Sequence, residues 1–208
     1  RNRVGGTTVA ERNVISGNGT QGIYADKDSI VQGNLIGTNA AGTLAVPNVS
    51  HGLTIRAGTH VIGGSSASAR NLISGNGGQG INVETSSTSV VISGNYIGTN
   101  ITGSAALGNT GNGVQTAFSS GVTVGGSTPG SGNLISGNGT GGVRFNNTCT
   151  GFVVAGNVIG LNAAGTAAVA NNGSGVWTFC SGATVGGTSS ASRNIISGNT
   201  QSGINFAS

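Results

Sequence analysis

The hexapeptide NLISGN at residues 71–76 returns almost unchanged along the chain, as NVISGN at 13–18, NLISGN at 133–138 and NIISGN at 194–199. Between these copies a related hexapeptide appears, as NLIGTN at 34–39, NYIGTN at 95–100 and NVIGLN at 157–162. The first asparagines of the seven copies are 21, 37, 24, 38, 24 and 37 residues apart. Short and long units therefore alternate, and this internal repetition decides the fold.

The composition of the 208-residue chain excludes several classes of protein. Glycine supplies 42 residues and only 6% of residues are charged, but there is no G-X-Y period, and Ile and Val recur at fixed spacing. This pattern argues against collagen and against disorder. The net charge of +4 is spread without a basic run, which argues against a nucleic-acid partner. No apolar run approaches the roughly 18 residues of a membrane span.

Three columns emerge when the seven copies are aligned. The first asparagines are Asn13, Asn34, Asn71, Asn95, Asn133, Asn157 and Asn194. A second asparagine follows each of them by five positions, at Asn18, Asn39, Asn76, Asn100, Asn138, Asn162 and Asn199. An isoleucine follows by two positions, at Ile15, Ile36, Ile73, Ile97, Ile135, Ile159 and Ile196. We expect the isoleucines to fill a narrow core and the asparagines to stack at corners, amide to amide.

Strand-like alternation follows each copy. Each copy is followed by a glycine and then an apolar residue, at Ile23, Leu53, Ile81, Val114, Val143, Val176 and Ile204. This residue and the one two positions after it would lie on the same face of a strand, and this period of two predicts a strand at each site. Another apolar segment, such as VVISGN at 90–95, leads into the next copy. Each turn of roughly 22 core residues thus predicts three short strands, stacked about 4.8 Å from the next turn in a β-solenoid. We expect a single domain over 1–208, belonging to a longer repeat array because both ends fall inside a repeat.

With its IGTN, IGG and RNVISGN units, at 36–39, 62–64 and 12–18, the whole chain resembles secreted bacterial surface proteins of the pectate-lyase-like β-helix superfamily. The resemblance implies an all-β fold, a single-stranded right-handed parallel β-helix of about seven coils, with a loop inserted in every second coil. It also implies an extracellular or cell-surface location. It says little of activity, because that superfamily includes lyases, hydrolases, adhesins and passive stalks.

The long units insert the same loop three times, as AAGTLAVPN at 40–48, ITGSAALGN at 101–109 and AAGTAAVAN at 163–171. One residue after each first asparagine lies an apolar column that should face outward, at Val14, Leu35, Leu72, Tyr96, Leu134, Val158 and Ile195. Two explanations remain open for its cover. The inserted loops fold back over it through Leu44, Val46, Leu107 and Val169, or another chain covers it, in a homopolymer or a lateral assembly.

The two cysteines, Cys149 and Cys180, occupy equivalent positions in adjacent coils. Stacked Cα atoms about 4.8 Å apart fall within the disulfide range, so we expect a bridge between coils and, with it, an oxidising location.

Charged residues are few, and their spacing predicts a ladder of alternating sign. Asp26, Arg56 and Glu84 share one position in three successive coils, so an acid, a base and an acid should stack. Asp26 and Asp28 also form a D-x-D pair, but two ligands are too few for calcium, and no metal site is expected.

One outward column suggests a binding face. Its members are Tyr24, Thr54, Asn82, Gln115, Arg144, Trp177 and Asn205, and among them Tyr24, Asn82, Gln115, Arg144 and Trp177 are the candidate glycan-binding residues. Trp177 would serve as the stacking platform for a polysaccharide. The alternative is an ordinary solvated face.

The supply of catalytic groups is poor. Only Asp26 and Asp28 are close enough for a carboxylate pair, and neither His51 nor His60 has a nucleophile and an acid at recognisable spacing. The repeated GG corners lack a P-loop lysine, and no cofactor is expected. The sequence therefore favours a non-catalytic structural segment, a stalk, fibre or adhesin shaft, and leaves self-association open. The alternative is a carbohydrate-binding or carbohydrate-active β-helix, a polysaccharide lyase or glycoside hydrolase, whose catalytic residues are absent or lie outside the segment.

Overall fold

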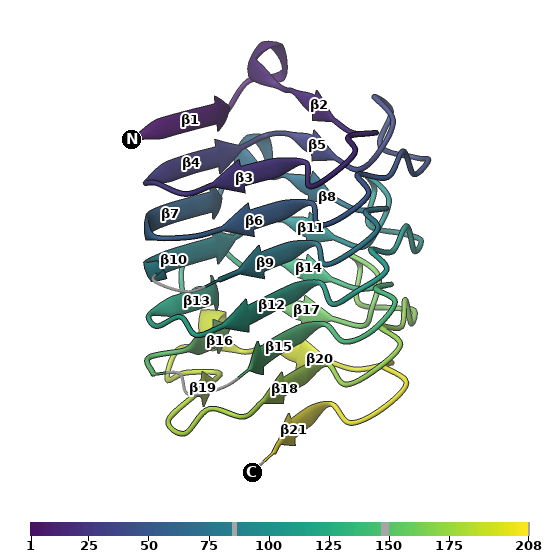
Figure 1. Ribbon diagram of the computed structural model, residues 1–208. Helices are drawn as coiled ribbons and strands as arrows, with labels where there is room; N and C mark the ends of the chain where they lie inside the picture. Colours follow the sequence, from purple (N-terminus) through teal and green to yellow (C-terminus); the bar gives the residue numbers. More distant parts are fainter. Residues whose placement is uncertain (85–86, 147–149, 208) are drawn as a thin grey trace.

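The computed structural model describes residues 1–84, 87–146 and 150–207 and shows an all-β solenoid (Figure 1). Three parallel sheets of seven strands each run the length of the molecule, and each coil contributes one strand to each sheet. The coils stack from β1 at the top of the view to β21 at the bottom, with the inserted loops on one side. The predicted parallel β-helix of about seven coils, with a loop in every second coil, is confirmed.

The strands of the first sheet are β1 (Asn2–Gly5), β4 (Ser29–Gln32), β7 (Gly58–Gly63), β10 (Ser87–Ser93), β13 (Val122–Gly125), β16 (Val153–Ala155) and β19 (Thr184–Val185). The second sheet consists of two-residue strands, β2 (Val14–Ile15), β5 (Leu35–Ile36), β8 (Leu72–Ile73), β11 (Tyr96–Ile97), β14 (Leu134–Ile135), β17 (Val158–Ile159) and β20 (Ile195–Ile196). The third sheet contains β3 (Ile23–Ala25), β6 (Leu53–Ile55), β9 (Ile81–Val83), β12 (Val114–Ala117), β15 (Val143–Asn146), β18 (Val176–Thr178) and β21 (Ile204–Phe206). Three single-turn 3₁₀ helices precede strands of the second sheet, η1 (Val9–Glu11), η2 (Ala67–Ala69) and η3 (Ser190–Ser192).

The core is a column of apolar side chains in strict register. Ile73 pairs with Ile36 on one side and with Ile97 on the other, and all three are fully buried. Because side chains alternate along a strand, one inward residue per strand of the second sheet is enough to repeat this column in every coil. In the later coils the larger Phe145 and Phe152 share the interior, with ring centroids 4.4 Å apart.

The first asparagines form a continuous hydrogen-bonded ladder beside the second sheet. Each side-chain amide donates to the side-chain oxygen of the asparagine in the next coil, at 2.9–3.1 Å, from Asn13 through to Asn194. The backbone adds to this, since the Asn71 N–H donates to Asn95 Oδ1 at 3.2 Å. Asn95 Nδ2 also donates to the Ile62 carbonyl of the preceding coil at 2.9 Å. The ladder thus satisfies buried polar groups and fixes the register of neighbouring coils.

A second ladder exists, but its membership differs from the prediction in the long coils. It runs through Asn18, Asn48, Asn76, Asn109, Asn138, Asn171 and Asn199, with amide-to-oxygen distances of 2.7–3.0 Å. Asn39, Asn100 and Asn162, which the constant spacing placed in it, instead sit at the start of the inserted loops. There Asn100 Oδ1 accepts from Ser104 N at 2.9 Å. The insertion lies between two asparagines, and the later one resumes the ladder.

The apolar column predicted to face outward is covered by the inserted loops in the inner coils, whereas Val14 and Ile195, in the first and last coils, are exposed. Leu72 is 1% exposed and Leu134 is 3% exposed. The backbone of Gly42 packs on the Leu72 side chain, and that of Gly103 packs on Leu134. Successive loops are also joined directly, because Ile101 N donates to the Gly42 carbonyl at 2.9 Å. The loops therefore supply the cover, and this column gives no support to a lateral assembly.

The predicted covering residues were only partly correct. Val169 is buried and Leu107 is half-buried, but Leu44 and Val46 are exposed. Backbone at the loop glycines approaches the apolar column more closely than a branched side chain is able to, which explains the difference.

The corrected ladder predicts unequal effects for Asn109→Ala and Asn100→Ala. Removal of Asn109 takes away the oxygen that accepts from both Nδ2 and N of Asn76, and leaves Asn138 Oδ1 without a donor among the described residues. We expect it to lower the free energy of unfolding by about 2–4 kcal/mol, against about 1 kcal/mol for Asn100 in its half-buried loop. Urea denaturation measures both. Equal losses, or a larger loss at Asn100, would contradict the assignment.

The loop packing predicts a contrast between Gly103→Ala and Gly165→Ala, which occupy the same loop position at φ +68° and +70°. Each substitution pays the left-handed backbone penalty of about 1–2 kcal/mol. At Gly103 the new Cβ also meets Leu134, Tyr96 and Ala163, whereas at Gly165 it meets open space. Thermal and urea unfolding should show Gly103→Ala as the less stable variant by a further ~1–3 kcal/mol. Matching losses would show that the loops do not pack as described.

Candidate binding site on the third sheet

The outer face of the third sheet carries the predicted binding column in unbroken register. Neighbouring members pair from strand to strand, as Tyr24–Thr54, Thr54–Asn82, Asn82–Gln115, Gln115–Arg144, Arg144–Trp177 and Trp177–Asn205. Their exposure is uneven, since Tyr24 is 47% exposed while Thr54 is 3% and Asn82 is 7% exposed. The face is therefore not one flat platform, and its two ends differ in chemistry.

At the N-terminal end, the polar groups of this face are bonded to one another. Arg56 Nη1 donates to the Tyr24 hydroxyl at 2.6 Å, and Arg56 Nε lies 3.4 Å from Glu84 Oε2. Asn82 Nδ2 donates to Glu84 Oε1 at 3.1 Å. Asp26, the third member of the predicted charge ladder, forms no ion pair within the described residues, whereas Arg56 and Glu84 do pair. The polar groups of Tyr24 and Asn82 are thus already hydrogen-bonded within the protein and are not free for a ligand.

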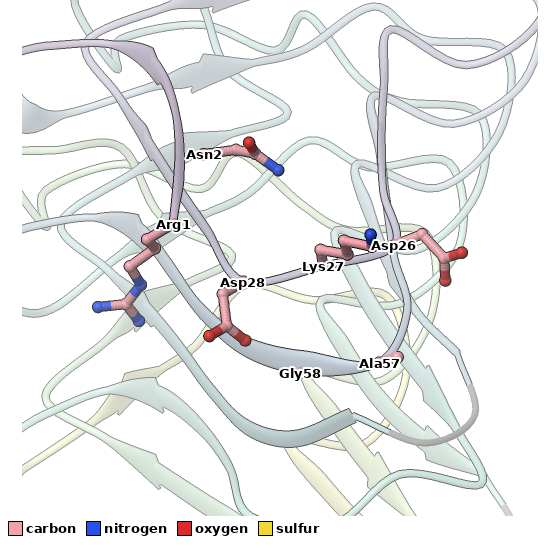
Figure 2. Close-up of a pocket in the computed structure, with 7 residues that line it drawn as sticks. All are labelled: Arg1, Asn2, Asp26, Lys27, Asp28, Ala57 and Gly58. Carbon is pink, nitrogen blue, oxygen red and sulfur yellow. The ribbon is translucent and has the colours of Figure 1, made fainter.

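Asp26, Lys27 and Asp28 line a pocket of about 440 Å³. Figure 2 shows that the Asp26 carboxylate points away from Asp28. Asp28 Oδ1 accepts a hydrogen bond from Thr59 N at 2.7 Å, and this bond lowers the pKa of Asp28. Two carboxylates that diverge do not form a catalytic pair. In the part of the chain that the structure describes, no three His, Cys, Asp or Glu side chains gather as metal ligands.

Both histidines have structural contacts. His60 is fully buried, and its Nε2 lies 3.0 and 2.8 Å from the carbonyl oxygens of Arg56 and Ala57. Because carbonyl oxygens only accept, Nε2–H of His60 donates there and holds the turn in which Ala57 has a φ of +30°. His51 Nδ1 accepts from Gln79 N at 2.9 Å. Neither ring contacts a carboxylate or a hydroxyl nucleophile among the described residues.

His51 begins a third polar row, just before the strands of the third sheet, and this row breaks off. Gln79 Oε1 accepts from Asn112 N in the same manner, and Asn112 Oδ1 accepts from Gly141 N at 2.8 Å. Gly141 has no side chain with which to continue. A hollow of about 230 Å³ opens at the break, lined by Asn112, Thr140, Gly141, Arg144, Asn172, Gly173, Ser174, Trp177 and Gln201.

Arg144 and Trp177 from the predicted face lie in this hollow, in an arrangement that differs from a bare stacking platform. The Arg144 guanidinium carbon lies 4.2 Å from the centre of the Trp177 ring, so one ring face is already covered. Arg144 Nε donates to Asn146 Oδ1 at 2.8 Å. Ser174 Oγ and Trp177 Nε1 are both buried with no hydrogen-bond partner among the described residues. Gln115, by contrast, accepts from Asn112 Nδ2.

The prediction based on the outward column did not include Gly141 and Ser174, which line the hollow. Aligning the residues that directly precede the glycine-apolar pairs gives Gln21, His51, Gln79, Asn112, Gly141, Ser174 and Ser202, in which the long polar side chain disappears at the fifth coil. That loss is the signal in the sequence that marks the hollow.

The predicted disulfide cannot be followed to both ends, because Cys149 lies outside the described residues. Cys180 is buried at the end of the sixth coil, and its backbone N–H donates to Thr178 Oγ1 at 3.0 Å. The bridge between Cys149 and Cys180 stays a prediction.

Comparison of the chain with protein-family models, with curated proteins and with solved structures gives no match. Among the described residues, no helix has the length and apolar character needed to cross a membrane.

The polar row predicts a pH dependence of stability through His51. Burial lowers the pKa of His51, opposed by the charge of Glu84, so the fold favours the neutral ring whose Nδ1 accepts from Gln79. This stabilisation is complete above the ordinary histidine pKa of about 6.5 and is lost as the pH falls below it. Urea unfolding near pH 7.5 and pH 5.0 should show the loss, and His51→Asn, which keeps an acceptor without titrating, should reduce it. An unchanged pH dependence in His51→Asn would contradict this role.

Proposed function

We propose that this chain is a non-catalytic structural segment of a secreted or cell-surface protein, a stalk, fibre or adhesin shaft of the pectate-lyase-like β-helix type. The observation that carries the proposal is the continuity of the two asparagine ladders. Both extend through all seven coils without a substitution, from Asn13 to Asn194 and from Asn18 to Asn199. A chain that keeps the same two asparagine positions in every coil is suited to holding distance and shape.

Continuity along the axis also supplies stiffness. Each coil is fixed to the next by three strand pairs and two amide bonds, and the core column is continuous between them. With a sheet spacing of about 4.8 Å, seven coils extend ~29 Å along the axis. Solenoid stability is a sum of local terms between neighbouring units, so such a segment lengthens without a new fold.

The chemistry of the surface supports a passive role over a carbohydrate-active one. Glycoside hydrolysis needs two carboxylates held across one bond, and the two adjacent acids, Asp26 and Asp28, diverge. Glu84 is engaged by Arg56 and Asn82, and Glu11 binds the backbone of Thr7 and Thr8. No acidic residue follows Glu84 in the sequence.

The proposal predicts mechanical integrity without turnover. In single-molecule pulling between the chain ends, the wild type should keep its length until a cooperative rupture, and Asn109→Ala should rupture at lower force because the second ladder is cut. Asn100→Ala serves as the matched control. Gradual extension at low force, with no difference between the variants, would argue against a load-bearing shaft.

The enzymatic alternative has its own readout. Incubation with neutral and acidic polysaccharides should release neither new reducing ends nor unsaturated uronates. Release that disappears in Asp26→Asn or Asp28→Asn would replace the structural proposal by the carbohydrate-active one.

A further inference from the structure

The hollow beside Gly141 is a polar site whose hydrogen-bonding groups are incompletely used. Asn112 Oδ1 reaches Gly141 N, and the row of side chains then stops. Ser174, in the next coil, is 3% exposed and has too short a side chain to bridge onward, so its Oγ lacks a partner among the described residues. Trp177 Nε1 lacks one as well. An unpaired buried polar group destabilises the fold, and a ligand that accepts a hydrogen bond from it would offset that cost.

The unpaired donors in the hollow favour a ligand that carries a negatively charged hydrogen-bond acceptor. An indole N–H only donates, and the terminal nitrogens of Arg144 have no hydrogen-bond partner among the described residues. The planar guanidinium fork matches a carboxylate in a two-point contact. No acid lines the hollow, and the sequence contains none beyond Glu84, so among the described residues no carboxylate there competes for Arg144.

The rest of the lining suits hydroxyl groups. Asn112, Thr140, Asn172 and Gln201 are neutral side chains that both donate and accept. A volume of about 230 Å³ is below the roughly 300 Å³ at which drug-sized pockets begin, so the ligand is small.

We propose that this hollow binds a small hydroxy acid, with its carboxylate on Arg144 and Trp177 Nε1 and its hydroxyl groups on Ser174 and the surrounding amides. To reach the buried donors the ligand displaces a long lining side chain, and Arg144 and Gln201 are the two available for that movement. The site does not depend on the shaft proposal, because it arises from a defect in one polar row and leaves both asparagine ladders intact.

The experiment uses the single tryptophan of the chain. In a ¹⁵N-labelled protein, Trp177 gives the one indole N–H resonance, which reports directly on the hollow. We expect this resonance to shift and saturate with sodium D-gluconate or D-glucuronate. D-glucose tests the hydroxyl groups without the charge, and sodium acetate tests the charge without the hydroxyl groups. Glucose and acetate should each bind at least tenfold more weakly than the sugar acids, as measured by the concentration that half-saturates the shift.

Variants separate binding from folding. Arg144→Gln should weaken binding of the sugar acid about tenfold or more, as expected for a charge-assisted contact. Ser174→Ala should weaken it a few-fold while leaving the urea midpoint unchanged or higher, because it removes an unpaired buried hydroxyl. Arg70→Gln is the matched control, since Arg70 also stacks on an aromatic ring, 4.0 Å from the centre of Tyr96, but away from the hollow.

The outcomes are decisive in both directions. A saturable shift with either sugar acid, weakened by Arg144→Gln and Ser174→Ala but not by Arg70→Gln, supports the site. Absence of a saturable shift, an equal response to glucose, an equal response to acetate, or insensitivity to Arg144→Gln would overturn it. None of these results alters the pulling experiment, so the two proposals fail separately.

Discussion

The amide-to-amide hydrogen bond between asparagines of successive coils is the constraint on which the rest of this structure depends. A parallel sheet of two-residue strands has little intrinsic register, because two residues offer few ladder bonds. The asparagine beside each strand supplies what the strand lacks, as Asn95 does when it bonds Asn71, Asn133 and the Ile62 carbonyl together. Once this register is set, Ile73 and Ile97 lie over each other and the narrow core follows.

Such a plan makes the surface consist of rows, and makes any irregularity in a row conspicuous. The row of His51, Gln79 and Asn112 satisfies backbone N–H groups of the next coil until glycine interrupts it. The side chains around the break are left with unused donors, whereas at the other end of the same face Arg56 connects Tyr24 and Glu84. Chemical individuality in this chain therefore resides in departures from the repeat.

Most of the fold could be predicted from spacing alone, because constant intervals translate directly into stacked positions. The first ladder, the isoleucine column and the outward column of the third sheet follow in this way. Spacing failed where an insertion permits two alignments, since both Asn100 and Asn109 fit a ladder position and only the packing of the loop selects Asn109. Spacing also failed to predict contacts between side chains at different strand positions. Arg56 donates to Tyr24 rather than pairing with Asp26, and Arg144 covers Trp177, because such contacts depend on side-chain rotamers and not on the repeat period.

The direct bonds between inserted loops limit how such an array is able to change its length. Ile101 N meets the Gly42 carbonyl and Ala163 N meets the Gly103 carbonyl, so each loop reaches past an unlooped coil to its counterpart two coils away. A duplication of one coil would break this reach and uncover the leucines beneath, while a duplication of a looped and an unlooped coil together would preserve it. The heritable unit of growth is accordingly the pair, and arrays of this kind should differ from one another by even numbers of turns.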